Sequence, residues 1–156
     1  MKKKIMLTLA GLVGLVVVML VAIFVWPLSF SKDIANDAEL RIQLTRTGIE
    51  NGEQHNTIYE YKYQPGSDEW LRIKQILSKY TYHRIIQTFT NDTEFDGRGT
   101  EYWLLIYSVE NQLVSGQILL GQPGKLAVNG HVYRIGFWGT KSAQSLSDEI
   151  RSVLGH

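Results

Sequence analysis

The chain has 156 residues, and its 16 basic and 15 acidic residues leave it almost without net charge. Three of the lysines stand at positions 2–4, so the rest of the chain carries 13 basic and 15 acidic residues, which gives no support to nucleic-acid binding. The chain contains no cysteine, which excludes disulfide bonds and thiolate metal sites.

The first predicted element is a membrane-spanning helix. The 24 residues of Ile5–Leu28 carry no charge, and 15 of them are Leu, Ile, Val or Phe. A helix of this length is about 36 Å long, whereas the hydrocarbon core of a bilayer is about 30 Å thick. The lysines before the run favour a cytoplasmic N-terminus. We therefore expect a single-pass protein of the cell membrane with an extracytoplasmic C-terminal domain.

A secretory signal peptide is the alternative interpretation of this segment. Ser29-Phe30-Ser31 is an acceptable cleavage pattern, and cleavage near Ser31 would release a secreted domain. The apolar part of a signal peptide is about 7–15 residues long, so the length of the run favours a retained anchor. The predicted organisation is cytoplasmic lysines and a transmembrane anchor, or an uncleaved signal, over residues 1–28, a short polar spacer over 29–38, and an extracytoplasmic domain over 39–156.

The remaining elements predict an α+β domain. Alternating apolar and polar residues at 39–47 and 57–63 predict a hairpin. An N-capping Ser67 and apolar residues at helical spacing predict a helix over 68–79. Predicted strands follow at 81–90, 100–109, 112–120, 125–128 and 131–138, and a second helix at 142–154. The order ββα, then a β-meander, then α predicts an antiparallel sheet of about five to six strands with both helices on one face.

The candidate binding residues are aromatic. Tyr59, Tyr61 and Tyr63 share one face of a predicted strand, where they would form a flat platform for a sugar or a peptide. Trp103 and Trp138 are candidates to extend this surface. The alternative interpretation is that these large side chains fill the core of a small domain and follow the β propensity of their strands.

The candidate metal centre is a weak calcium site. Asp92, Glu94 and Asp96 stand at alternate positions before a glycine, like the first half of a calcium-binding loop. The twelfth position, where such loops have a bidentate Glu, is Trp103, and Glu101 lies two residues earlier. The alternative interpretation is a solvated turn built on Asp96 and the glycine after it. No cofactor other than weakly bound calcium is expected.

No catalytic or phosphate-binding motif is complete in the sequence. The layout resembles small membrane-anchored exported proteins of Gram-positive bacteria that carry a domain of unknown function. The features that carry this resemblance are the lysine-flanked anchor, the helix with Trp70, the turn at 121–125, the strand at 132–135 and the closing helix. The resemblance implies no catalytic residues.

The expected function is that of a membrane-tethered binding domain at the cell envelope, of which immunity proteins and inhibitors are examples. Besides the membrane, its partner would be another envelope protein, a peptide or a cell-wall component, and not a nucleic acid. A calcium-stabilised structural domain of the envelope is the alternative. The third hypothesis is an enzyme whose catalytic residues are distant in the sequence.

Overall fold

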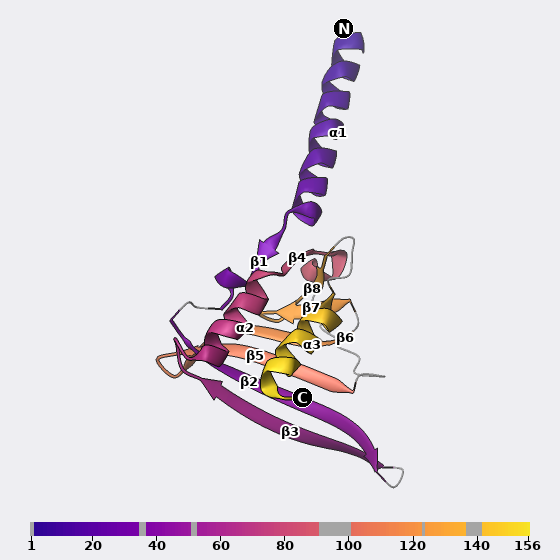
Figure 1. Ribbon diagram of the computed structural model, residues 1–156. Helices are drawn as coiled ribbons and strands as arrows, with labels where there is room; N and C mark the ends of the chain where they lie inside the picture. The colour runs from indigo at the N-terminus through magenta and orange to yellow at the C-terminus, as the bar shows by residue number, and fades with distance from the viewer. Residues whose placement is uncertain (1, 35–36, 51–52, 91–100, 123, 137–141) are drawn as a thin grey trace.

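The computed structural model describes residues 2–34, 37–50, 53–90, 101–122, 124–136 and 142–156, and of residues 2–8, 50 and 122 it describes the backbone alone. Within these ranges the chain forms three α-helices, two 3₁₀ helices and one antiparallel sheet of eight strands (Figure 1). The predicted α+β class is confirmed.

The elements in chain order are α1 (Lys2–Val25), β1 (Leu28–Ser29), the 3₁₀ helix η1 (Phe30–Lys32), β2 (Glu39–Glu50), β3 (Glu53–Tyr63), α2 (Asp68–Ser78), β4 (Thr81–Arg84), the 3₁₀ helix η2 (Ile86–Phe89), β5 (Tyr102–Glu110), β6 (Leu113–Gln122), β7 (Lys125–Val128), β8 (His131–Ile135) and α3 (Ala143–Leu154). The strand order across the sheet is β1-β4-β8-β7-β6-β5-β2-β3. Strands β5 to β8 therefore form a meander, and β4 crosses over to pair with β8 instead of β5.

Two strand predictions need correction. The sheet is larger than the expected five to six strands, in part because β1 lies where the sequence predicts anchor and spacer. The strand predicted over 81–90 ends at Arg84 and continues as η2. Its β-branched and aromatic residues favour a strand, but the Thr88 hydroxyl accepts a hydrogen bond from the Ile85 amide at 2.9 Å and donates one to the Val132 carbonyl. These side-chain bonds hold a tight turn in place.

Helices α2 and α3 lie on the same face of the sheet (Figure 1). Each begins at a serine N-cap: the Ser67 hydroxyl accepts from the Trp70 amide at 3.3 Å, and the Ser142 hydroxyl accepts from the Ser145 amide at 3.1 Å. Gly155 ends α3 in the left-handed conformation, with φ 81°, where a side chain would be strained. The short polar caps therefore fix where both helices begin.

The hydrophobic core lies between this helix pair and the sheet. Its centre is formed by inward-facing residues of neighbouring strands, for example Leu44 opposite Leu104, and Ile106 opposite Ile118. Ile150 of α3 is buried with them in the same cluster. Because side chains alternate along a strand, the opposite face of the sheet carries a different set of residues.

The stretch predicted as a polar spacer belongs to the folded domain. Phe30, Ile34 and Ala38 are almost completely buried. The backbone of Asp33 lies so close to Gly116 that a Cβ at that glycine would be 1.5 Å from the Asp33 carbonyl oxygen. These three apolar positions are therefore packed into the domain, although the polar residues around them predict a spacer.

Helix α1 stands away from the domain (Figure 1). Of its described side chains, at residues 9–25, only Phe24 is partly covered, and the large apolar ones are 42–66% exposed. Within the part of the chain that the structure describes, no helix combines the length and hydropathy that define a membrane span. A helix is thus present where the sequence predicts one, whereas the predicted crossing of a membrane stays a prediction.

Candidate functional site

The three candidate tyrosines lie on β3, at the edge of the sheet farthest from β1. Tyr59, Tyr61 and Tyr63 face the helix side, where they pack against the core and are partly buried. The Tyr61 hydroxyl is 2.6 Å from Nε2 of His156, and the rings of Tyr59 and His156 have centroids 4.6 Å apart. Burial raises the pKa of Tyr61. The row is therefore fixed by the C-terminus, and only part of each ring is open to a ligand.

The two candidate tryptophans do not extend this row within the described residues. Trp103 pairs with Thr45, whereas Tyr59 pairs with Leu44, so the pleat places Trp103 on the opposite face of the sheet from Tyr59. The indole of Trp103 lies over Gly121, where a Cβ would be 2.3 Å from a ring carbon. The expected continuous platform of tyrosines and Trp103 is therefore divided by the sheet. Trp138 lies outside the described residues.

The candidate calcium ligands are mostly beyond the described ranges. Asp92, Glu94 and Asp96 lie outside the described residues. Glu101 is described, and its carboxylate is 3.4 Å from the Arg46 guanidinium while its carbonyl accepts from the Thr47 amide at 2.8 Å. The described residues contain no group of three or more potential metal ligands. The calcium site stays a prediction.

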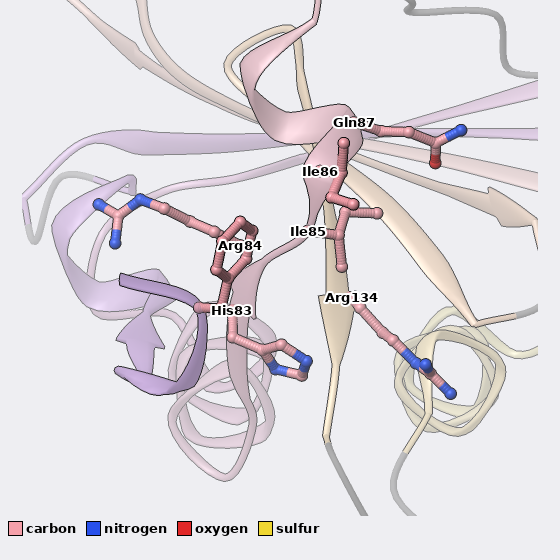
Figure 2. Close-up of a pocket in the computed structure, with 7 residues that line it drawn as sticks. His83, Arg84, Ile85, Ile86, Gln87 and Arg134 are labelled. Atoms are coloured by element: carbon pink, nitrogen blue, oxygen red, sulfur yellow. The ribbon is translucent and has the colours of Figure 1, made fainter. Parts of the chain in front are cut away.

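A pocket of about 540 Å³ lies where α1 meets the sheet. It is lined by Phe24, the consecutive residues 83–87 and Arg134. His83 of β4 pairs with Arg134 of β8, and Figure 2 shows both side chains reaching toward the same side while Arg84 extends away from them. The turn into η2 supplies the apolar residues between them. The pocket therefore combines an apolar lining with basic groups at its border.

The charge of this pocket is positive. His83 is only 4% exposed, and burial, followed by the nearby Arg134 guanidinium, lowers its pKa. No carboxylate of the described residues forms an ion pair with Arg84 or Arg134. The two arginines therefore lack a counter-charge within the described residues, and the pocket suits an anion.

The surface around the pocket is apolar. Trp26, Ile86 and Phe89 are 68%, 77% and 61% exposed. The rings of Phe24 and Phe89 meet edge to face with their centroids 5.9 Å apart. This contact brings η2 beside the last turn of α1 and groups the exposed side chains at one end of the molecule.

Asp33 and Tyr82 form a second polar cluster near the same edge. The Tyr82 hydroxyl donates a hydrogen bond to the Asp33 carboxylate, and Tyr82 meets Tyr133 edge to face with ring centroids 4.9 Å apart. Burial raises the pKa of Asp33, and burial followed by the bond to Asp33 raises that of Tyr82. The pair joins η1 to β4, so we assign it a structural role.

Sequence reasoning did not find the pocket or the contacts of His156. The usable signal is local: Ile85, Ile86 and Phe89 follow Arg84 in a segment that the sequence analysis predicts to be a strand. Arg134 and Phe24 reach the pocket only through the fold. Comparisons of this chain with protein-family models, with curated proteins and with solved structures find no match.

Proposed function

We propose that this chain is a membrane-tethered extracytoplasmic domain of the cell envelope that binds a protein or peptide partner. The described side chains of α1 are apolar and exposed, which is costly in water and favourable in a bilayer. The uncharged run of Ile5–Leu28 is long enough to span the bilayer, and the preceding lysines favour a cytoplasmic N-terminus. In the bilayer, the exposed apolar side chains of α1 would contact lipid instead of water.

The observation that carries the proposal is the placement of the two edges of the sheet. Helix α1 leads into the edge strand β1 through Trp26 and Pro27 alone, whereas β3 forms the other edge. Proline restricts the backbone, so this connection leaves little freedom between anchor and domain. A domain held in this way keeps β1 near the membrane and presents β3 away from it.

Strand β3 is the surface proposed for partner binding. Its 11 residues form an outer edge of the sheet, and the backbone groups of an edge strand are able to pair with an extended segment of a partner. The exposed parts of Tyr59, Tyr61 and Tyr63 would add aromatic contact area on one face. Glu60 and Lys62 on the other face guard against unselective pairing and supply charge selectivity. Tethering raises the effective concentration of such contacts.

Topology is testable by cysteine labelling, because the natural chain has no cysteine. A membrane-impermeant maleimide should label Gln54→Cys in intact cells and label Lys3→Cys only after lysis. Labelling of Lys3→Cys in intact cells would contradict the orientation. Recovery of the chain in the medium, shortened at its N-terminus, would favour the cleaved signal peptide.

Partner binding is testable by in-cell crosslinking of the full-length, C-terminally tagged chain, followed by mass spectrometry. The double variant Glu60→Lys with Lys62→Glu keeps the net charge and leaves the tyrosines intact, and should reduce recovery of the dominant partner at least about tenfold. Glu69→Lys with Arg72→Glu, on the exposed side of α2, is the matched control and should change little. Equal recovery from both variants would exclude β3 as the binding surface.

A further inference from the structure

The depth of η2 follows from its contact with α1. Phe24 lies in the last turn of α1, and its ring meets that of Phe89. If α1 is in the membrane, Phe89 lies at the depth of that last turn, and Ile86 of the same 3₁₀ helix is also exposed. Exposed apolar side chains beside an anchor insert favourably into the interfacial region of a bilayer. Helix η2 is therefore a second membrane contact.

The two arginines lie close to the same level. Strand β4 runs antiparallel to β1, with Tyr82 paired to Leu28, so the chain moves toward α1 as it reaches Arg84. Arg84 is two residues beyond Tyr82, which at about 3.3 Å per residue brings it about 7 Å nearer the anchor. Arg134 borders the same pocket from β8. This is the level at which lipid phosphates are found beside a membrane anchor.

We propose that this pocket binds one anionic phospholipid of the leaflet that surrounds the end of α1. Arg134 would hold the phosphate, and an acyl chain would lie along Phe24, Ile85 and Ile86. The inference rests on the membrane tether proposed above. The guanidinium geometry suits phosphate, and Arg134 has no carboxylate partner among the described residues.

The lining favours a lipid over a free phosphate ion. Phe24, Ile85 and Ile86 offer apolar surface that inorganic phosphate would leave uncovered, whereas an acyl chain would bury it. The volume of about 540 Å³ is within the range that small-molecule pockets have. The positive charge further favours an anionic lipid over a zwitterionic one.

Native mass spectrometry of the full-length chain tests this inference. The chain is reconstituted in nanodiscs of equimolar phosphatidylcholine and phosphatidylglycerol, and the lipids retained on release are counted. We expect phosphatidylglycerol to be enriched. Arg134→Gln should lower the enrichment roughly fivefold, because a cation at an anionic surface is worth about 1 kcal/mol. Arg84→Gln should lower it less, because the Arg84 side chain extends away from Arg134. Arg134→Lys should largely keep it, and Lys62→Gln on β3 should leave it unchanged.

Each other outcome has a defined meaning. Equal retention of both lipids, or unchanged enrichment in Arg134→Gln, would overturn the lipid site. Displacement of the lipid by millimolar inorganic phosphate would show that free phosphate suffices, and would also overturn it. A chain that fails to enter nanodiscs would contradict the tether itself, whereas incorporation without lipid preference contradicts this inference alone.

Discussion

The two edges of the sheet have opposite surroundings. At the β1 edge, α1, η1 and η2 surround the strands, and the exposed side chains include Trp26, Ile86 and Phe89. At the β3 edge the side chains are mostly polar and exposed, and Tyr59 and Tyr61 contact the C-terminal residue His156. Large apolar side chains are exposed at both edges, but at the β1 edge they lie beside the anchor.

This difference indicates a division of roles along one sheet. A surface that exposes large apolar groups next to Arg134, which has no carboxylate partner among the described residues, suits the interface of an anionic bilayer. A polar edge strand is suited to exposure to water and to pairing with a selective partner. The two ends also differ in how firmly they join the core, because Phe30 and Ile34 are buried in it while the described part of the β2–β3 hairpin end is largely exposed.

The largest expected effect is that of Phe30→Ala, which tests whether the β1 edge is part of the core. Phe30 is 1% exposed, so its truncation should lower the free energy of unfolding by about 3–5 kcal/mol. The measurement is urea unfolding of the full chain in mild detergent, followed by near-ultraviolet circular dichroism. Phe89→Ala is the matched control, and should cost less than about 1 kcal/mol because that ring is exposed. Similar costs for both variants would mean that η1 behaves as a spacer.

Gly116→Ala should have the next largest effect. The new methyl group would meet the Asp33 carbonyl oxygen. Because the methyl group is fixed rigidly to the backbone of β6 and the oxygen is itself a backbone atom, relief requires a shift of the chain at Asp33 or of β6. We expect a loss of about 2–3 kcal/mol in the same urea experiment. Gly48→Ala on β2 is the matched control, because a Cβ there meets nothing within 4 Å. A loss in Gly48→Ala as large as in Gly116→Ala would contradict the close contact of η1 with the sheet.

The regular elements of the domain were largely predictable, because their signals are local. The helix around Trp70 has both an N-cap and an apolar stripe, and β2 shows the alternation that one buried face requires. The crossover of β4 to β8, and the burial of Phe30 and Ile34, depend on contacts between distant residues. A single apolar residue within a polar stretch does not show in the sequence which residues it packs against in the fold.

The candidate sites were less predictable for the same reason. Tyr59 and Tyr61 were assigned to one face correctly by their spacing, but the sequence could not show that His156, 95 positions after Tyr61, would contact them. Trp103 was grouped with the tyrosines by residue type, whereas the strand register decides on which face it lies. The pocket required the end of α1, the turn after β4 and a residue of β8 to meet, and no local pattern encodes this.

A smaller effect is expected at the β3 edge from Tyr61→Phe. This change removes the hydroxyl that contacts His156 and leaves the packed ring, so the loss should be about 0.5–1 kcal/mol. Deleting His156 should cost more, because it also removes the ring contact with Tyr59 and the bond from the His156 amide to the Arg151 carbonyl. The double variant should cost less than the sum, because both changes remove the contact of Tyr61 with His156. Thermal unfolding of the four chains measures this coupling. Full additivity would mean that the hydroxyl and the imidazole do not interact.

The smallest effect concerns the pH dependence that His83 adds to the β1 edge. The pKa of His83 is lowered from 6.5 on folding, mainly by burial and then by Arg134. A base of this kind stabilises the fold above its unfolded pKa, and this contribution is lost as the pH falls through the lower folded pKa. At about pH 6 the loss is at most about 0.8 kcal/mol.

His83→Gln should remove this pH dependence. The difference in unfolding free energy between the natural chain and the variant should therefore shift with pH below 6.5 and stay constant above pH 8. Arg134→Gln should make the shift smaller, because it raises the folded pKa. A difference that is constant from pH 5 to pH 8 would mean that His83 is solvated in the folded chain, and that the interior of the β1 edge is more open to water than its burial indicates.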